Sequence, residues 1–105
     1  MKFHFCSFVL IIIILITIGI NTFVWAENGT LFVKKCGACH RKDGKAPPIN
    51  PADKAALVWK RYFKRKRHPI DLSNIITPNE LQQILTYLQE HAADSDQPEA
   101  AVIPK

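Results

Sequence analysis

Hydrophobic and polar positions divide the chain into a long apolar stretch near the N-terminus and several amphipathic segments after it. Between Phe3 and Ala26 there is no Lys, Arg, Asp or Glu. The stretch ends in Val24-Trp25-Ala26 with Glu27 just beyond, as a signal-peptidase site would. We therefore expect residues 1–26 to be a signal peptide or, because a stretch of this length can span a bilayer, an uncleaved membrane anchor. Both alternatives deliver the rest of the chain across a membrane.

Two segments after the leader have the apolar spacing of helices. The first covers residues 28–36, with Leu31 and Phe32 on its inner face. A loop rich in Gly and Pro follows, from Arg41 to Asp53. The second helix is expected from Ala52 to about Lys66. Its apolar positions at helical spacing are Ala55, Val58, Trp59, Tyr62 and Phe63.

A third helix opens at Thr77, which is the expected N-cap residue, with Pro78 in the first position and Glu80 completing a capping box. Its apolar stripe consists of Leu81, Ile84, Leu85 and Leu88. After His91 the sequence becomes polar and loses its periodicity, which predicts a loosely packed C-terminal tail over residues 92–105. No convincing strand occurs, so the predicted fold class is all-α.

Removal of residues 1–26 would leave 79 residues, which is enough for one small domain. We place that domain at residues 27–91. A hydrophobic core of this size usually needs a covalent or metal staple. We therefore expect the domain to contain such a staple.

The residues Cys36-Gly37-Ala38-Cys39-His40 match the C-x-x-C-H pattern of covalent haem attachment. Two thiols three residues apart on a helical turn can each add to one vinyl group of the porphyrin. The imidazole that follows can then bind the iron as the proximal ligand. We predict one covalently attached haem c on Cys36, Cys39 and His40.

Two other chemistries are open to the same cysteines. Outside the cytoplasm they could form a disulfide, but a thioredoxin-like redox site would need a βαβ pattern that is absent around the motif. A zinc ion could be held by a four-ligand set. That set would be Cys36, Cys39, His68 and His91. The wide spacing of the two histidines is unlike that of common zinc sites, and zinc needs no histidine directly after Cys39.

Over residues 28–91 the chain resembles small monohaem cytochromes c of the bacterial class I type. Leu31-Phe32 and Tyr87 resemble the residues at which the family's first and last helices cross, although Gly29 stands one position later than the family's usual glycine. Ala46-Pro47-Pro48-Ile49 resembles the family's proline loop. The resemblance implies three main helices wrapped around the haem, and a backbone carbonyl at Pro48 that orients the proximal imidazole.

The family's distal iron ligand is normally a methionine, but the only methionine here is Met1. Two histidines remain after His40 and the leader are set aside. His68 lies between the second and third helices, where the family's methionine would be, and we predict that it binds the iron. His91, at the end of the last helix, more simply complements the helix dipole. An open sixth position remains the alternative.

The chain has 14 Lys and Arg against 9 Asp and Glu, and Lys2 is the only one of these charges in the leader. Six basic residues lie in the eight-residue segment Lys60–Arg67. They form either a solvated helix face beside the haem propionates or a patch that steers an acidic redox partner. An exported haem domain gives no support to nucleic-acid binding.

We predict an electron carrier of the periplasm, or of another compartment outside the cytoplasm, rather than an enzyme. Residues on the inner helix faces would exclude water from the haem, and these are Phe32, Trp59, Tyr62, Leu85 and Leu88. Ligation by two imidazoles predicts a reduction potential below that of a His/Met cytochrome. The alternatives are a haem-based sensor or peroxidase-like protein with an open sixth site, and a membrane-anchored haem subunit of a respiratory complex held by residues 3–26.

Overall fold

The computed structural model describes residues 4, 6–10 and 28–105. The predicted leader, residues 1–26, therefore lies largely outside the described residues. Within the leader, residues 6–10 are helical. Every helix within the described ranges is too short or too polar for a bilayer crossing.

The described residues form an all-α fold, as the sequence predicts. The first helical segment covers residues 28–36, and two longer helices follow, α2 (Ala56–Lys64) and α3 (Pro78–Glu90). Two single 3-10 turns, η1 (Pro51–Asp53) and η2 (Leu72–Asn74), lie in the loops that precede α2 and α3. These ranges contain no β-strand, only one isolated bridge in a loop.

The start of α3 is the one that the sequence predicts. The hydroxyl of Thr77 accepts a hydrogen bond from the Glu80 amide at 3.2 Å, and the Thr77 amide donates to the Glu80 carboxylate at 3.1 Å. Pro78 occupies the first helical position, where no amide hydrogen is needed. This capping box satisfies amides that would otherwise lack partners at the helix start.

The start of α2 differs from the prediction. Residues from Ala52 belong first to η1, and the backbone at Ala55 is extended, with φ −67° and ψ 154°. The helix therefore begins four residues later than expected. The buried face of α2 is also narrower than the sequence predicts, because Trp59 is buried whereas Val58, expected on the same face, is 46% exposed.

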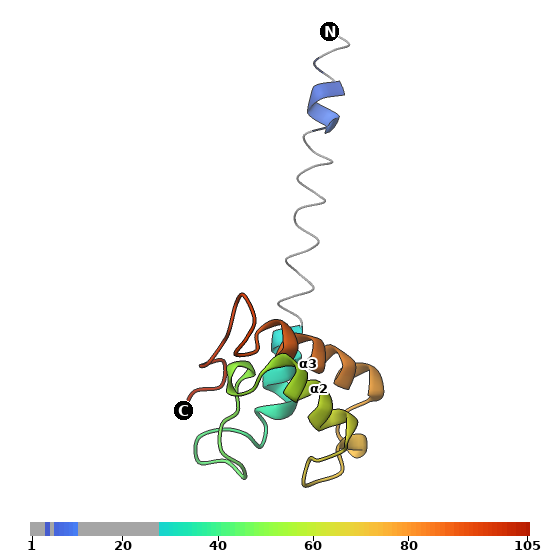
Figure 1. Ribbon diagram of the computed structural model, residues 1–105. Coiled ribbons are helices and arrows are strands. Elements are labelled where there is room, and N and C mark those ends of the chain that lie inside the picture. Colours follow the sequence, from blue (N-terminus) through green and yellow to red (C-terminus); the bar gives the residue numbers. More distant parts are fainter. Residues whose placement is uncertain (1–3, 5, 11–27) are drawn as a thin grey trace.

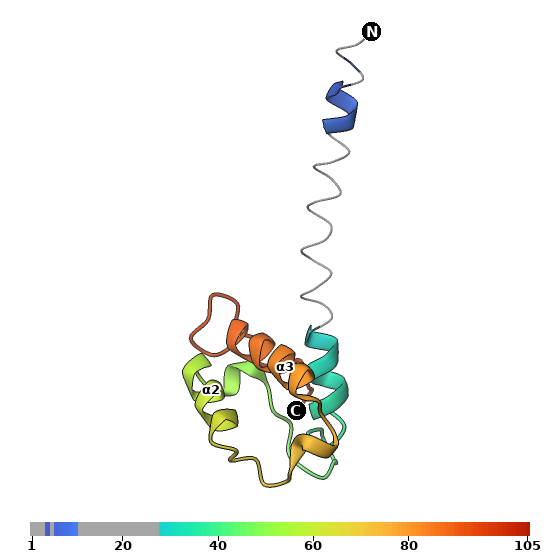
Figure 2. The ribbon, with the colours of Figure 1, turned by 90° about the vertical axis from the view of Figure 1, so that its right-hand side faces the viewer.

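Helix α3 is the centre of the core, with α2 on one side and the first helical segment on the other (Figure 2). The rings of Phe32 and Tyr87 pack with their centroids 5.6 Å apart. Gly29 permits this crossing, because a Cβ there would lie 3.2 Å from the Tyr87 ring. The buried hydrophobic side chains of the core are Phe32, Trp59, Ile76, Ile84, Tyr87, Leu88, Ala92 and Ile103.

The C-terminal segment is packed more tightly than its sequence predicts. Ala92 and Ile103 are buried in the core, and the amide and carbonyl of Ile103 bond to the side chain of Asn50. The sequence pattern missed this because isolated contacts from an irregular segment leave no periodicity. Residues 92–105 are therefore part of the folded domain and not a loose tail.

Candidate functional site

The cysteine motif begins where the first helical segment ends. The amides of Cys39 and His40 both donate to the Cys36 carbonyl, at 3.3 and 2.9 Å, which folds the motif into a further turn. Gly37 is required in that turn, because a Cβ on it would lie 2.2 Å from the Val33 carbonyl oxygen. The turn thus brings both thiols and the imidazole into one short, constrained stretch of backbone.

His40 is oriented by the loop that follows it. His40 is bridged to Ala46, and its Nδ1 lies 2.9 Å from the carbonyl oxygen of Pro47. The family resemblance implied this contact for the Pro48 carbonyl. The pairing of His40 with Ala46 instead brings the carbonyl of Pro47, the residue after Ala46, within reach of the ring. A ring that donates its Nδ1 proton to a carbonyl keeps a lone pair on Nε2 for a metal. Pro48 itself is half-buried beside this contact.

The loop between α2 and α3 places His68 opposite His40. The two ring centroids are 6.1 Å apart, and the ring planes meet at 77°. Both imidazoles come from the loops on the lower side of the molecule in Figures 1 and 2. Residues that are 28 positions apart in the chain are thereby brought together around one small gap.

The backbone of Ile70 holds the His68 ring. Nδ1 of His68 lies 3.2 Å from the Ile70 carbonyl oxygen and 3.3 Å from the Ile70 amide nitrogen. Only one of these two contacts can be a hydrogen bond in a given tautomer. With the proton on Nδ1, the ring donates to the carbonyl, and Nε2 has its lone pair free to bind a metal.

The spacing of the two rings fits a metal that binds both of them. A bond from a histidine nitrogen to a metal is about 2 Å long, and the ring centre lies about 1 Å behind that nitrogen, so two axial imidazoles would place their centres about 6 Å apart. The observed 6.1 Å agrees with this separation. With Cys36 and Cys39 beside His40, the donor set is the one that covalent haem requires.

A cavity of about 650 Å³ opens on the His68 side of the gap. Its size is within the range of small-molecule and cofactor sites. Most of its wall is apolar, and the apolar lining residues are Phe63, Pro69, Ile70, Leu72, Ile76, Pro78 and Leu81. The two cysteines and His40 are not among the lining residues of this cavity.

Burial changes the acidity of the first cysteine of the motif. Desolvation, with a smaller contribution from the nearby Cys39, raises the pKa of Cys36 to about 11. The thiol is therefore protonated at neutral pH. A redox-active dithiol needs the opposite shift, because its attacking sulfur must be a thiolate.

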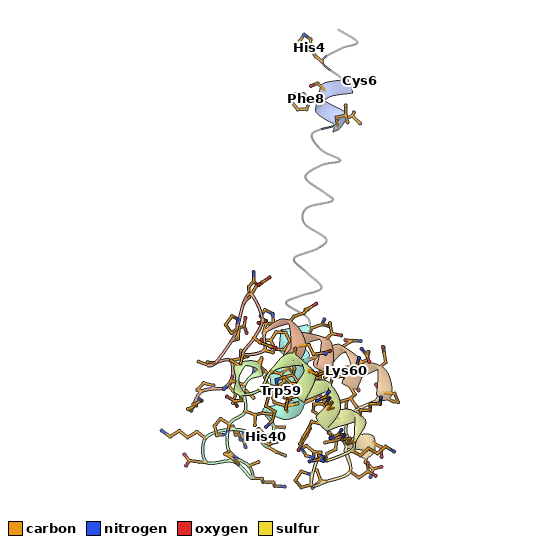
Figure 3. All side chains as sticks on the ribbon, in the orientation of Figure 1. His4, Cys6, Phe8, His40, Trp59 and Lys60 are labelled. Atoms are coloured by element: carbon orange, nitrogen blue, oxygen red, sulfur yellow. The ribbon has the colours of Figure 1, made fainter. Side chains whose placement is uncertain are left out.

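The two aromatic residues predicted to cover the haem are both buried, but in different surroundings. Trp59, labelled in Figure 3, lies on α2. Its Nε1 donates to the Pro51 carbonyl at 2.8 Å, and its ring stacks on Phe63, a residue of the cavity wall, with the ring centroids 6.4 Å apart. Phe32 instead packs on Tyr87 at the helix crossing and is not a lining residue of this cavity. Trp59 therefore supports the distal wall, whereas Phe32 belongs to the core.

His91 lies apart from the histidine pair. It follows α3 directly, its ring packs on Tyr87 at 4.7 Å, and Nδ1 lies 2.8 Å from the Gln97 carbonyl oxygen. Its contacts are thus with the helix end and the C-terminal segment. Among the described residues, no three His, Cys, Asp or Glu side chains are grouped to share an ion. The four-residue zinc set is therefore not assembled.

Sequence reasoning missed the two backbone carbonyls that orient the imidazoles, those of Pro47 and Ile70. A carbonyl oxygen is present in every residue, so residue type gives no signal for it.

The basic segment Lys60–Arg67 runs along the outer face of α2 and into the distal loop. All six of its Lys and Arg residues are exposed, and the described part of the chain gives none of them an ion-pair partner. Lys66 lines the cavity together with His68. The segment therefore adds positive charge at the edge of the site.

No model of a known protein family, no curated protein and no solved structure matches this chain. The site is therefore interpreted from its own geometry and chemistry.

Proposed function

We propose that this protein is an exported c-type cytochrome that carries one electron at a time. Cys36 and Cys39 would hold one haem by thioether bonds, with His40 as the proximal and His68 as the distal ligand. The observation that carries the proposal is the pairing of the His40 and His68 rings at 6.1 Å directly beside the cysteine motif.

The chain itself supplies orientation and shielding. Nδ1 of His40 lies within hydrogen-bond distance of the Pro47 carbonyl and Nδ1 of His68 within that of the Ile70 carbonyl, so a proton on each Nδ1 would leave both Nε2 lone pairs available to iron. When bound, haem supplies an iron that changes between the ferric and ferrous states. The apolar wall of the cavity limits the access of water to it. No substrate bond has to be made or broken, so we assign no catalytic residue.

The proposed ligand pair sets the direction of the reduction potential. Imidazole stabilises ferric iron more than a methionine thioether does. The only methionine, Met1, lies within the predicted leader. We therefore expect a potential below that of a His/Met cytochrome.

The alternatives have less support. The raised pKa of Cys36 is opposite to what a redox-active dithiol needs. A sensor or peroxidase-like protein requires an open iron position, and the facing His68 ring opposes that. The segment that would anchor a membrane-held haem subunit, residues 3–26, lies largely outside the described residues. We place the mature domain outside the cytoplasm, with an acidic redox protein as its partner at the segment Lys60–Arg67.

The deciding experiment is absorption spectroscopy of the oxidised and reduced protein, with its mass. We expect the mass to include one covalently attached haem. The absorption spectrum should show low-spin bands and the near-infrared features of iron bound by two imidazoles. His68→Ala should convert the iron to a form that binds carbon monoxide when reduced. His91→Ala, the matched control, should keep the wild-type spectrum. Leader cleavage is read from the same mass measurement.

Two results would contradict the proposal. A colourless protein with the mass of its polypeptide alone, made in cells that attach haem, excludes the cofactor. A haem protein whose low-spin bands survive in His68→Ala excludes His68 as the distal ligand.

A further inference from the structure

The C-terminal segment is fixed to the loop after the cysteine motif by a buried amide. Asn50 is fully buried, its Nδ2 donates to the Ile103 carbonyl at 3.0 Å, and its Oδ1 accepts from the Ile103 amide at 2.8 Å. A side-chain amide that pairs with both backbone groups of one residue mimics a strand partner. Both polar ends of Asn50 are satisfied without water, which makes the contact specific for this residue type.

Further contacts hold the same segment at other points. The Ala52 amide donates to the Glu99 carbonyl at 2.9 Å, and the Ala93 amide donates to the Lys54 carbonyl at 3.1 Å. The carboxylate of Glu99 accepts a hydrogen bond from the Tyr87 hydroxyl. Residues 93–103 are therefore attached to the domain along their whole length and not at one point only.

Ile103 ends on the cysteine motif. A Cβ on Gly37 would lie 3.6 Å from Cδ1 of Ile103, which is van der Waals contact. Ile103 is only 3% exposed and belongs to the hydrophobic cluster against which Cys36 packs. The side chain of Ile103 thus lies next to the turn at Gly37, between the two cysteines.

We propose that residues 99–105 are a cover over the attachment turn Cys36–His40, closed by Asn50 and sealed by Ile103. The inference rests on the proposed function, because the group to be shielded is the haem edge at the two thioether bonds. Asn50 and Ile103 act as positioning residues and touch no iron ligand. Cys36 packs against the same hydrophobic cluster that contains Ile103.

The cover has a consequence for the haem. Water stabilises the more highly charged ferric state, so the exclusion of water on the thioether side raises the reduction potential. This opposes the lowering that is expected from two imidazole ligands. Opening the cover should therefore shift the potential to more negative values and leave the iron ligands in place.

Hydrogen exchange and potentiometry of the haem-loaded full chain test the cover. In Asn50→Ala and in Ile103→Ala we expect the amides of Cys39 and His40 to exchange about tenfold faster or more, because the bonds and the contact that hold the segment are lost. Exchange in α3 should keep its rate, the potential should fall, and the low-spin spectrum should be unchanged. Asp96→Ala, an exposed change in the same segment, and Leu57→Ala, an exposed aliphatic truncation on α2, are the controls.

Each result decides the proposal. Wild-type exchange at Cys39 and His40, or an unchanged potential in Ile103→Ala, overturns the cover, and so does a uniform increase that includes α3. If Asn50→Ala does not fold, Ile103→Ala decides alone. If the protein carries no haem, the proposed function fails, and exchange at Cys39 and His40 then decides the cover separately.

Discussion

At the scale of single residues, the hydrogen bond at one ring nitrogen decides what each histidine can do. Nδ1 of His40 and Nδ1 of His68 each lie near a backbone carbonyl of their own loop, and the two ring centroids are 6.1 Å apart. His91 also bonds through Nδ1, but its ring lies on Tyr87 at the other end of α3. The same residue type therefore has two roles, set by the element that carries it.

Tyr87 is a second residue whose environment sets its chemistry. Burial, followed by the hydrogen bond to Glu99 and the charge of that carboxylate, raises the pKa of the Tyr87 hydroxyl well above its ordinary value. A tyrosine normally ionises near pH 10 when the chain is unfolded. The folded state holds the hydroxyl proton more tightly than the unfolded chain does. The stabilisation that the protonated Tyr87 gives is therefore complete below that pH and is lost as the pH rises above it.

We predict that Tyr87→Phe lowers the free energy of unfolding by about 1 kcal/mol at pH 7, through the loss of the bond to Glu99. The ring contact with Phe32 is kept. The difference from wild type should be constant up to about pH 9 and should shrink above about pH 10. Urea unfolding followed by circular dichroism from pH 7 to 11 measures it. A difference that grows above pH 10 would contradict the assignment.

At the scale of elements, the backbone at the C-terminal end of α2 is strained at a residue whose type does not indicate it. Lys66 has φ 49°, in the left-handed region, and the amides of Lys66 and Arg67 return to the Phe63 and Tyr62 carbonyls, both at 3.2 Å. This is the Schellman arrangement, in which glycine is the usual residue at the left-handed position. A lysine there keeps a basic charge beside His68 at the expense of helix-end stability.

We predict that Lys66→Gly raises the free energy of unfolding by up to about 1 kcal/mol, because glycine adopts this backbone conformation without strain. Arg65→Gly removes the same charge at the preceding residue, where φ is −87°. We expect that control to be neutral or destabilising. Thermal unfolding of both variants measures the effect, and equal shifts in the two would show that charge alone was responsible.

At the scale of the whole molecule, positive charge is collected on one side of the candidate site. The six basic residues of the segment Lys60–Arg67 are exposed, and Lys66 shares the cavity wall with His68. Glu80 is paired with Lys35, so its negative charge is partly neutralised. The long-range field at the site is therefore positive, which favours anionic partners.

We predict that oxidation of the reduced protein by ferricyanide slows about tenfold from 10 mM to 500 mM salt, because the attraction between unlike charges is screened. The variant Lys64→Glu/Arg65→Glu should show a slower rate at low salt and the wild-type rate at high salt. Lys105→Glu, at the C-terminus, should behave as wild type. Stopped-flow absorbance gives the rates. A rate independent of salt would exclude steering by this segment.

The elements with strong local signals were the ones predicted correctly. The capping box of α3 joins residues within a few positions of one another, so the sequence carries the whole signal. The start of α2 was wrong by four residues, because apolar spacing continues through η1 although the backbone at Ala55 is extended. The prediction of which carbonyl orients His40 was wrong by one residue, because a backbone oxygen has no sequence signature.

The sequence by itself determined the chemistry that is present: two thiols and an imidazole in one motif, two further histidines, and no methionine after the leader. Only the tertiary structure decided which histidine faces His40, since that depends on where two loops meet in space. It also decided that residues 92–105 are part of the core. A single buried amide at Asn50 and a single aliphatic side chain at Ile103 make those contacts, and contacts between distant segments leave no periodic pattern along a chain.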